Sequence, residues 1–296
     1  EMRQMRSLPP DSAEWPIEMA YVKFFNLDKQ FLNRLEGASD LRLKYQYSDH
    51  FVMNARYSYI YSNQIFGSRQ NFSYLNATVE TAGNLLNGLS ILSDGPVDEN
   101  GVRQIFGVPY AQYAKVSIDA KRYFYHGSKN TFVVRALAGV GLPYANSLAL
   151  PYEKSYFGGG PSTMRAWQLR RLGPGSYKGS DNILERVGDI SLVLNVEERF
   201  PLFGPLEGGV FVDAGNVWLM NQSDDYTDGE WKWDRCYKEL AVGTGLGLRL
   251  NISVLTIRFD FAIPVYDPGF ASGETFRLPH WRFNQIVTNF GIDYPF

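Results

Sequence analysis

The sequence predicts an all-β protein whose strands form a transmembrane antiparallel β-barrel. Along most of the chain, apolar residues alternate with polar or small ones, which is typical of strands with two chemically different faces. The predicted strands are joined by links that are alternately short and long, as in a barrel that crosses a membrane. Aromatic residues make up 15% of the chain, with 19 Tyr and 20 Phe, and this favours strands.

The C-terminal half shows the alternation most clearly. In its first segment the apolar Leu192, Leu194 and Val196 point to one side of the predicted strand. The other side has the charged Glu197 and Arg199. Strands of this kind are expected at 191–199, 209–214, 242–249, 257–263 and 285–296.

The N-terminal half repeats the pattern less regularly. Five strands are expected there, at 16–25, 51–63, 71–87, 110–125 and 131–142. Together the two halves give about ten strands. We expect one more strand around 40–48, a short helix at 27–36, and a disordered or extended lead-in at 1–15.

The links between the predicted strands fall into two length classes. The short links are 126–130, 201–207 and 251–253, and the long links are 88–109, 143–188, 219–238 and 265–284. In a transmembrane barrel the short turns lie in the periplasm and the long loops lie outside. A soluble barrel would turn its apolar face inward, whereas here the second face is charged and rich in glycine, so lipid has to cover the apolar one.

Composition argues against several other classes of protein. The net charge of −2 gives no basic surface for nucleic acid. The single Cys236 excludes an internal disulfide, and the three histidines lie too far apart for a zinc site, so we expect neither a metal nor a cofactor. The glycines of 243–247 lie inside a predicted strand, unlike a nucleotide-binding loop, and 158–162 lacks the order of a hydrolase elbow. We therefore expect no enzymatic activity.

The chain ends on an aromatic residue at the close of an alternating strand. Phe290, Ile292, Tyr294 and Phe296 share one face. This arrangement resembles the C-terminal targeting signal of bacterial outer-membrane proteins, which implies an integral outer-membrane protein. An ordinary amphipathic last strand is the alternative interpretation.

The long link 143–188 contains a second recognisable motif. Gly159 and Gly160 precede the tetrapeptide 164–167, and Gly173-Pro174 follows it. This order resembles the conserved inward-folded loop of the BamA/TamA superfamily of outer-membrane assembly factors, closest to the TamL or BamA type. The family tetrapeptide is Val-Arg-Gly-Phe/Tyr, and this chain has Met164, Arg165, Ala166 and Trp167 in its place.

The resemblance implies that Arg165 reaches into the lumen and pairs with acids on the barrel wall. Glu197 and Asp213 match the family positions, and alternation independently places both on the polar, inward face. A buried arginine needs paired carboxylates, because breaking such a pair costs roughly 3–5 kcal/mol. We call Arg165, Glu197 and Asp213 the loop latch, and expect the glycines at 243, 245 and 247 to leave room for the loop. The alternative is a set of unrelated lumen charges.

The resemblance also implies a function. Such proteins assemble or insert nascent outer-membrane or surface proteins through a weak barrel seam, where a client strand adds to an unpaired edge. Their partners are outer-membrane lipids, client proteins, and accessory lipoproteins or an inner-membrane or periplasmic protein. A passive channel, a two-partner secretion pore, the barrel anchor of a fused patatin-like lipase and a soluble β-protein are the alternatives.

The family barrel has about sixteen strands. Residues 1–296 would then be the C-terminal part of a single barrel domain, containing its last ten or so strands. We expect the first strands, the periplasmic POTRA domains and the export signal to precede Glu1.

Overall fold

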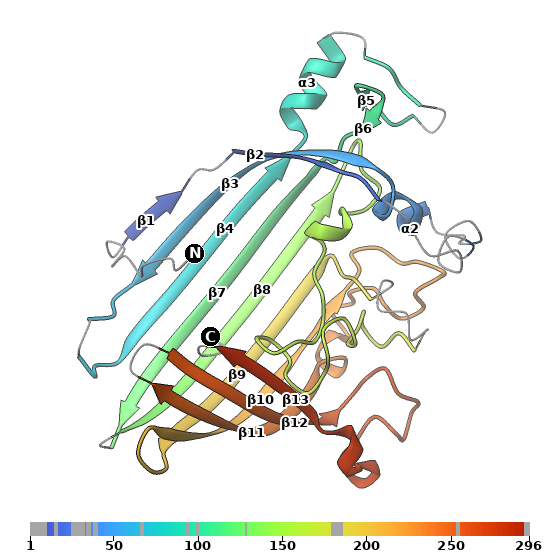
Figure 1. Cartoon of the computed structure of the whole chain (residues 1–296). Helices are drawn as coiled ribbons and strands as arrows, with labels where there is room; N and C mark the ends of the chain where they lie inside the picture. The colour runs from blue at the N-terminus through green and yellow to red at the C-terminus, as the bar shows by residue number, and fades with distance from the viewer. Residues whose placement is uncertain are drawn as a thin grey trace.

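The computed structural model describes residues 11–14, 17–24, 33, 37, 41–65, 68–92, 95–98, 101–127, 129–178, 186–252 and 255–292. One antiparallel sheet of 11 strands makes up most of the described chain (Figure 1). Its strands are β1 (Asp11–Glu14), β2 (Ile17–Val22), β3 (His50–Ser62), β4 (Phe72–Ala82), β7 (Tyr113–His126), β8 (Asn130–Pro143), β9 (Ile190–Pro201), β10 (Leu206–Trp218), β11 (Ala241–Ile252), β12 (Leu255–Tyr266) and β13 (Val287–Ile292).

The remaining elements lie in the links. A two-stranded sheet joins β5 (Gln104–Ile105) to β6 (Val108–Pro109). The helices are α2 (Leu41–Gln46) and α3 (Asn84–Leu92), with short 3-10 helices η1 (Tyr152–Lys154), η3 (Cys236–Lys238), η4 (Leu278–His280) and η5 (Phe283–Gln285). Among the described residues, no helix is both long and apolar enough to cross a membrane.

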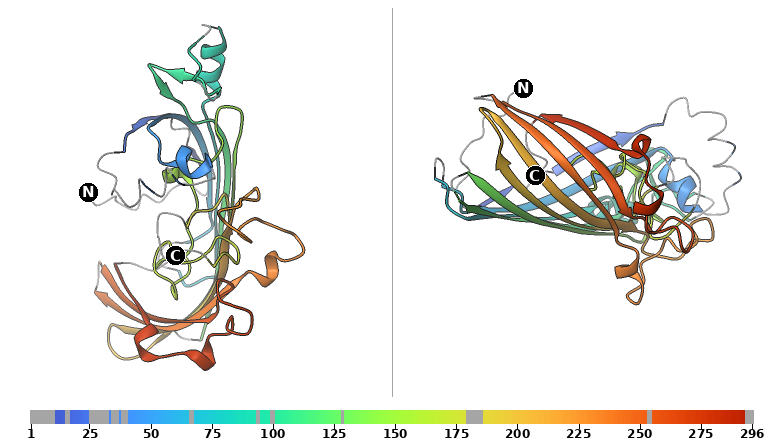
Figure 2. Two further views of the ribbon diagram at one scale, coloured as in Figure 1. Left: turned by 90° about the vertical axis from the view of Figure 1, so that its right-hand side faces the viewer. Right: turned by 90° about the horizontal axis from the view of Figure 1, so that it is seen from below.

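Strands of the large sheet follow one another as an up-and-down meander. From β3 to β13 each strand pairs with the next large-sheet strand along the chain, while β1 and β2 pair with successive parts of β3. The sheet is strongly curled, and the described strands leave it open between β1–β2 and β13 (Figure 2). All ten strands expected from alternation are confirmed, and the described chain is an open section of barrel wall.

Burial along the strands shows which face meets lipid. In β9 the apolar Leu194 and Val196 are 41% and 37% exposed, whereas the intervening Asn195 and Glu197 are fully buried. The same inversion holds in β12, where Phe259 is exposed and Asp260 is buried. Because the loop that covers the polar face lies on the concave side of the sheet, the apolar residues are on the convex side, where hydrocarbon has to cover them (Figure 2).

Two sequence-based expectations about the N-terminal half need correction. The strand expected at 40–48 is helix α2, because β2 pairs directly with β3 and leaves the segment between them no place in the sheet. The strand expected to reach residue 87 stops at Ala82, since Gly83 has a φ of 76° and α3 follows. Within the lead-in expected to be disordered or extended, residues 11–14 form the extended strand β1. The helix expected at 27–36 falls almost wholly outside the described residues.

Candidate functional site

The long loop between β8 and β9 folds back over the concave face of the sheet (Figure 2). Its tip is a closed turn: Gly158 bridges Leu172, and the Gly160 amide donates to the Trp167 carbonyl at 2.9 Å. Gly159 has a φ of 90° and Gly160 a φ of 108°, values that residues with a side chain rarely adopt. The glycine pair therefore lets the chain reverse just before Arg165.

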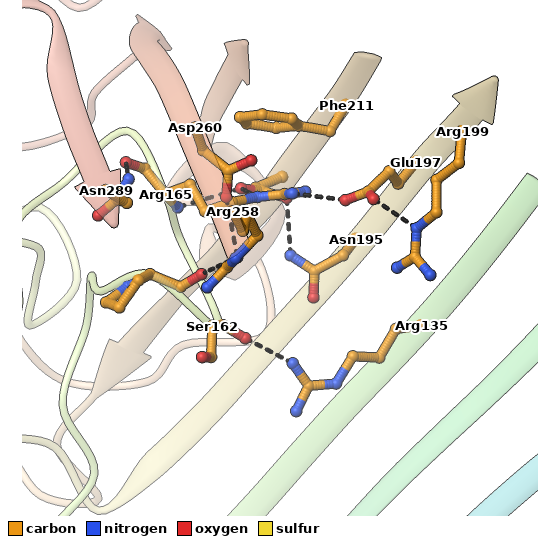
Figure 3. Close-up of polar contacts among 12 residues, drawn as sticks. Arg135, Ser162, Arg165, Asn195, Glu197, Arg199, Phe211, Arg258, Asp260 and Asn289 are labelled. Carbon is orange, nitrogen blue, oxygen red and sulfur yellow. Dashed lines mark hydrogen bonds and ion pairs between the residues drawn. The ribbon is translucent and has the colours of Figure 1, made fainter. Parts of the chain in front are cut away.

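Arg165 is fully buried between the loop tip and the wall (Figure 3). Its Nε and Nη2 donate to the two carboxylate oxygens of Asp213 at 2.9 and 2.8 Å, and its Nη1 donates to Glu197 Oε2 at 2.5 Å. The backbone amide of Arg165 also donates to Asp213 at 3.0 Å. The three residues expected to form the loop latch are thus in direct contact, with two strands, β9 and β10, supplying the acids.

The ring of Phe211 faces the guanidinium, with Arg165 Cζ 3.4 Å from the ring centroid. Burial lowers the pKa of Arg165, but the hydrogen bonds and charge of Asp213, followed by the charge of Glu197, raise it above its usual range. Arg165 therefore keeps its positive charge in the closed site. Its planar guanidinium bonds Asp213 through Nε and Nη2 and Glu197 through Nη1, which the single ammonium group of a lysine could not do in the same geometry.

Sequence reasoning missed the charges around the latch. Glu197 Oε1 also accepts from Arg199 at 2.6 Å and lies 2.7 Å from Arg249 Nη2. Asp260 pairs with Arg258 at 2.8 Å. We define the buried charge cluster as Arg165, Glu197, Arg199, Asp213, Arg249, Arg258 and Asp260; each is at most 7% exposed. Alternation places the wall members on the inward face, but nothing in the sequence indicates that they surround one loop.

Side chains of four different strands bind the backbone of the loop tip. Four carbonyl oxygens, spread over residues 161–165, each accept one hydrogen bond at 2.6 to 3.0 Å. The pairs are Pro161 with Arg258 of β12, Ser162 with Arg135 of β8, Thr163 with Asn195 of β9, and Arg165 with Asn289 of β13. Figure 3 shows the contacts of Arg135 with Ser162 and of Asn289 with Arg165. The wall therefore recognises the path of the tip as well as its arginine.

The apolar residues of the loop motif pack against the same wall. Met164, Ala166 and Trp167 are 1%, 3% and 6% exposed and belong to one hydrophobic cluster with residues of β9 to β12. The indole of Trp167 also donates to Asp267 at 2.8 Å. Although these three residues differ from the family tetrapeptide, they still provide an apolar, aromatic surface beside Arg165. The docked tip is therefore held by packing as well as by charge.

The remaining motif glycine and proline lie away from the tip. A Cβ on Gly173 would lie 2.6 Å from Asn216 Oδ1 and 2.7 Å from Val217 at the end of β10, and Pro174 packs near Gly229. Gly173-Pro174 therefore fits the loop against the outer end of the wall, where only a residue without a side chain has room.

Of the three glycines expected to make room for the loop, only Gly243 faces it directly. A Cβ there would lie 2.5 Å from Ala166 Cβ and 3.1 Å from the Trp167 ring. Gly245 accommodates the Phe211 ring, and Gly247 accommodates the Arg249 guanidinium. Those two glycines serve the loop indirectly, by letting the wall's own side chains lie flat beside the latch.

We predict that Gly243→Leu weakens docking of the tip, because overpacking a close contact typically costs about 1–3 kcal/mol. With Cys236 replaced by serine, a cysteine at Met164 should then react faster with a maleimide. Gly88→Leu in α3, where nothing lies within 4 Å of an added Cβ, is the matched control. Equal reactivity in the two variants would contradict the assigned contact.

The expected C-terminal signal is only partly described. Phe290 and Ile292 of β13 are 60% and 64% exposed and share the outward, apolar face. Tyr294 and Phe296 lie outside the described residues. Within the described chain, no group of three or more His, Cys, Asp or Glu side chains is placed to hold a metal ion.

The chain is similar to known proteins in sequence and in fold. The model of the Omp85 superfamily domain matches residues 25–280. The outer membrane protein assembly factor BamA of Neisseria meningitidis serogroup B is 24% identical over 132 residues, which cover 42% of this chain and 17% of that protein. A crystal structure of BamA from Haemophilus ducreyi lacking POTRA domains 1–3 aligns with 82% of this chain and 54% of that one, with 14% identity and a TM-score of 0.41.

The chain thus spans a minor part of the curated relative and about half of the solved structure. The family match, by contrast, extends over most of the chain, including the loop, the latch acids and the strands between them. The chain belongs to the Omp85 superfamily as a BamA/TamA-type member, and its place is the bacterial outer membrane.

Proposed function

We propose that this chain forms the seam-bearing C-terminal part of an outer-membrane assembly factor, which inserts or translocates nascent outer-membrane or surface proteins. Members of the Omp85 superfamily mediate assembly or translocation of this kind. The observation that most supports the proposal for this chain is the position of β13. This edge strand directly contacts the long loop between β8 and β9, which we call the latch loop.

Strand β13 is short and weakly held. Its six residues, Val287–Ile292, pair with Ala262–Ile257 of β12, and no other described strand pairs with its opposite edge. An edge strand presents a row of free amide and carbonyl groups that can pair with another chain. A client strand could therefore extend the sheet at β13 by main-chain hydrogen bonds, which need little sequence specificity.

The latch loop is coupled to this edge. Asn289 in the middle of β13 donates to the carbonyl of Arg165 at 2.9 Å, and the residue is 9% exposed. Docking of the tip thus supports the register of β13 on β12. We propose that the loop latch, Arg165 with Glu197 and Asp213, keeps the edge in a defined position while a client strand adds to it.

Cross-linking in the full-length protein tests the seam. In the Cys236→Ser background, Phe290→Cys on β13 should form a disulfide with a cysteine placed in the last strand of a nascent outer-membrane protein. Val140→Cys, which is also outward-facing but lies in β8 between β7 and β9, is the matched control and should not. Client cross-links of equal yield at both positions, or at neither, would contradict insertion at β13.

Ion conductance of the same protein in planar bilayers distinguishes an assembly factor from a passive channel. A passive channel predicts a steady ion conductance and no client cross-link. The loop tip occupies the concave face over β8 to β13, so we expect little conductance while the tip is docked. Steady conductance of the wild-type protein, unaffected by release of the tip, would favour the channel.

The wider organisation of the protein is also a proposal. Residues 1–296 would be one part of a single barrel domain, and the open sheet and the greater length of the relatives support this. The first strands and the POTRA domains would lie elsewhere in the same protein. We propose a non-enzymatic mechanism, with outer-membrane lipids, client proteins and accessory lipoproteins or a periplasmic or inner-membrane protein as partners.

A further inference from the structure

We propose that the latch loop has a second attachment, centred on the ion pair between Lys154 and Glu80, which holds its base to the N-terminal strands independently of Arg165. We call Glu80, Tyr113, Lys115, Lys154 and Tyr156 the base anchor. It lies where the loop leaves β8, on the inner face of β4 and β7, whereas the loop latch lies on β9 and β10.

Glu80 is the centre of the base anchor. Its side chain is 6% exposed, and Oε1 lies 2.9 Å from Lys154 Nζ of the loop. The same oxygen accepts a hydrogen bond from the buried Tyr113 hydroxyl at 2.6 Å, and Oε2 lies 2.9 Å from Arg56 Nη2. A carboxylate this buried and this fully paired is costly to leave without its partners.

Lys115 of β7 strengthens the attachment through the backbone. Its Nζ donates to the Lys154 carbonyl at 2.6 Å and lies 4.0 Å from the centroid of the Tyr156 ring. The Tyr156 hydroxyl donates to the Val116 carbonyl at 3.3 Å, and the ring occupies the space left by Gly139. The wall thus holds a backbone group, an ammonium group and an aromatic ring of the same loop segment.

Neighbouring contacts extend the attachment to the rest of the N-terminal half. Glu153 lies 2.9 Å from Nε2 of His50, the first residue of β3. Helix α2 reaches the two ends of the loop: the Tyr45 hydroxyl bonds Ser147 at 2.7 Å, and Arg42 pairs with Asp189 at 2.5 Å. The base of the loop is therefore enclosed by N-terminal elements.

The loop consequently ties two parts of the wall together. Its base is attached to β3, β4 and β7, and its tip to β8, β9, β10, β12 and β13. A movement that separates the N-terminal from the C-terminal strands has to release one attachment. Lys154 is 14% exposed while Arg165 is fully buried, so water reaches the base anchor more easily and we expect it to release first.

A double-mutant cycle in the full-length protein tests the base anchor. The reporter is Ser155→Cys in the Cys236→Ser background, since Ser155 is 6% exposed and should react with a maleimide only when the base lifts. Glu80→Gln and Lys154→Met should each raise the labelling rate about tenfold, and the double variant should raise it no further. Independent effects would multiply to about a hundredfold.

Two controls separate this result from misfolding and from failure of the proposed function. Lys129→Met removes an exposed lysine in the β7–β8 turn and should leave the labelling rate unchanged. Variants are compared only where heat-modifiable migration on semi-native gels shows a folded barrel, and the labelling requires no client. Arg165→Ala should raise labelling at a Met164→Cys reporter but not at Ser155→Cys. Unchanged labelling in both single variants, multiplicative effects, or equal release of both reporters by Arg165→Ala would overturn the proposal.

Discussion

Replacing Glu197 by glutamine is expected to destabilise the folded protein more than any other single change in the loop latch. Its carboxylate faces Arg165, Arg199 and Arg249 at 2.5 to 2.7 Å, and all four side chains are at most 8% exposed. The buried charge cluster contains four arginines and three carboxylates, so removal of one carboxylate leaves two uncompensated positive charges away from water. Breaking a buried ion pair costs roughly 3–5 kcal/mol.

The expected loss is measured as a lower urea midpoint in detergent micelles and as the loss of heat-modifiable migration on semi-native gels. Glu198→Gln is a close control. Glu198 is the next residue of β9, faces outward, and pairs with His126 at 3.0 Å with 31% of its side chain exposed. An exposed pair of this kind contributes at most about 1 kcal/mol. If the two variants lost the same stability, the charge cluster would not be the cause.

A second substitution checks the electrostatic reason. Adding Arg249→Met to Glu197→Gln removes one of the stranded cations, and part of the lost stability should return. Methionine is apolar and flexible enough to occupy the slot over Gly247 that holds the guanidinium. A double variant that is less stable than Glu197→Gln alone would show that Arg249 acts through packing and not through the excess charge.

Arg165→Ala is expected to release the loop tip and abolish assembly while the wall stays folded. The substitution removes three side-chain hydrogen bonds and the contact with Phe211. The carboxylates left behind keep other donors: Asp213 accepts from Asn195 at 2.8 Å, and Glu197 retains two arginines. The substitution therefore weakens docking of the tip more than it destabilises the sheet.

A docking loss of about 3 kcal/mol corresponds to roughly a hundredfold larger population of the released tip. Maleimide labelling at Met164→Cys should rise by that order, and cross-linking of clients at Phe290→Cys should fall with it. Arg165→Lys should give an intermediate result, because an ammonium group keeps the charge but cannot bond both carboxylates in the fork geometry. Wild-type labelling and client cross-linking in Arg165→Ala would show that the contacts of Arg165 with Asp213 and Glu197 are needed neither for docking of the tip nor for assembly.

Asp213→Asn is expected to destabilise the folded protein less than Glu197→Gln does. The amide keeps one acceptor for Arg165, whose Nη1 still pairs with Glu197. Arg165 would lose one of its two counter-charges, and labelling at Met164→Cys should rise less than in Arg165→Ala. A larger rise than in Arg165→Ala would place the main energetic contribution on Asp213 itself.

Alternation along the sequence by itself determined the strands and the faces that they present. Side chains in a strand point to opposite sides at every second residue, a local property that needs no knowledge of neighbours. The ten strands and the inward positions of Glu197 and Asp213 follow from this rule. The segment 40–48 shows where the rule fails: it has a strand-like pattern, yet β2 and β3 pair with each other and exclude it from the sheet.

The tertiary structure alone decided which inward residues meet. Arg199, Arg249 and Asp260 come together around the loop tip because of strand register and the path of the loop, and both depend on contacts between residues far apart in sequence. The same holds for Lys154 and Glu80. An inward-facing polar residue could pair with any of several other inward-facing polar residues, and the sequence does not distinguish among them. Only the folded chain decides which of them it contacts.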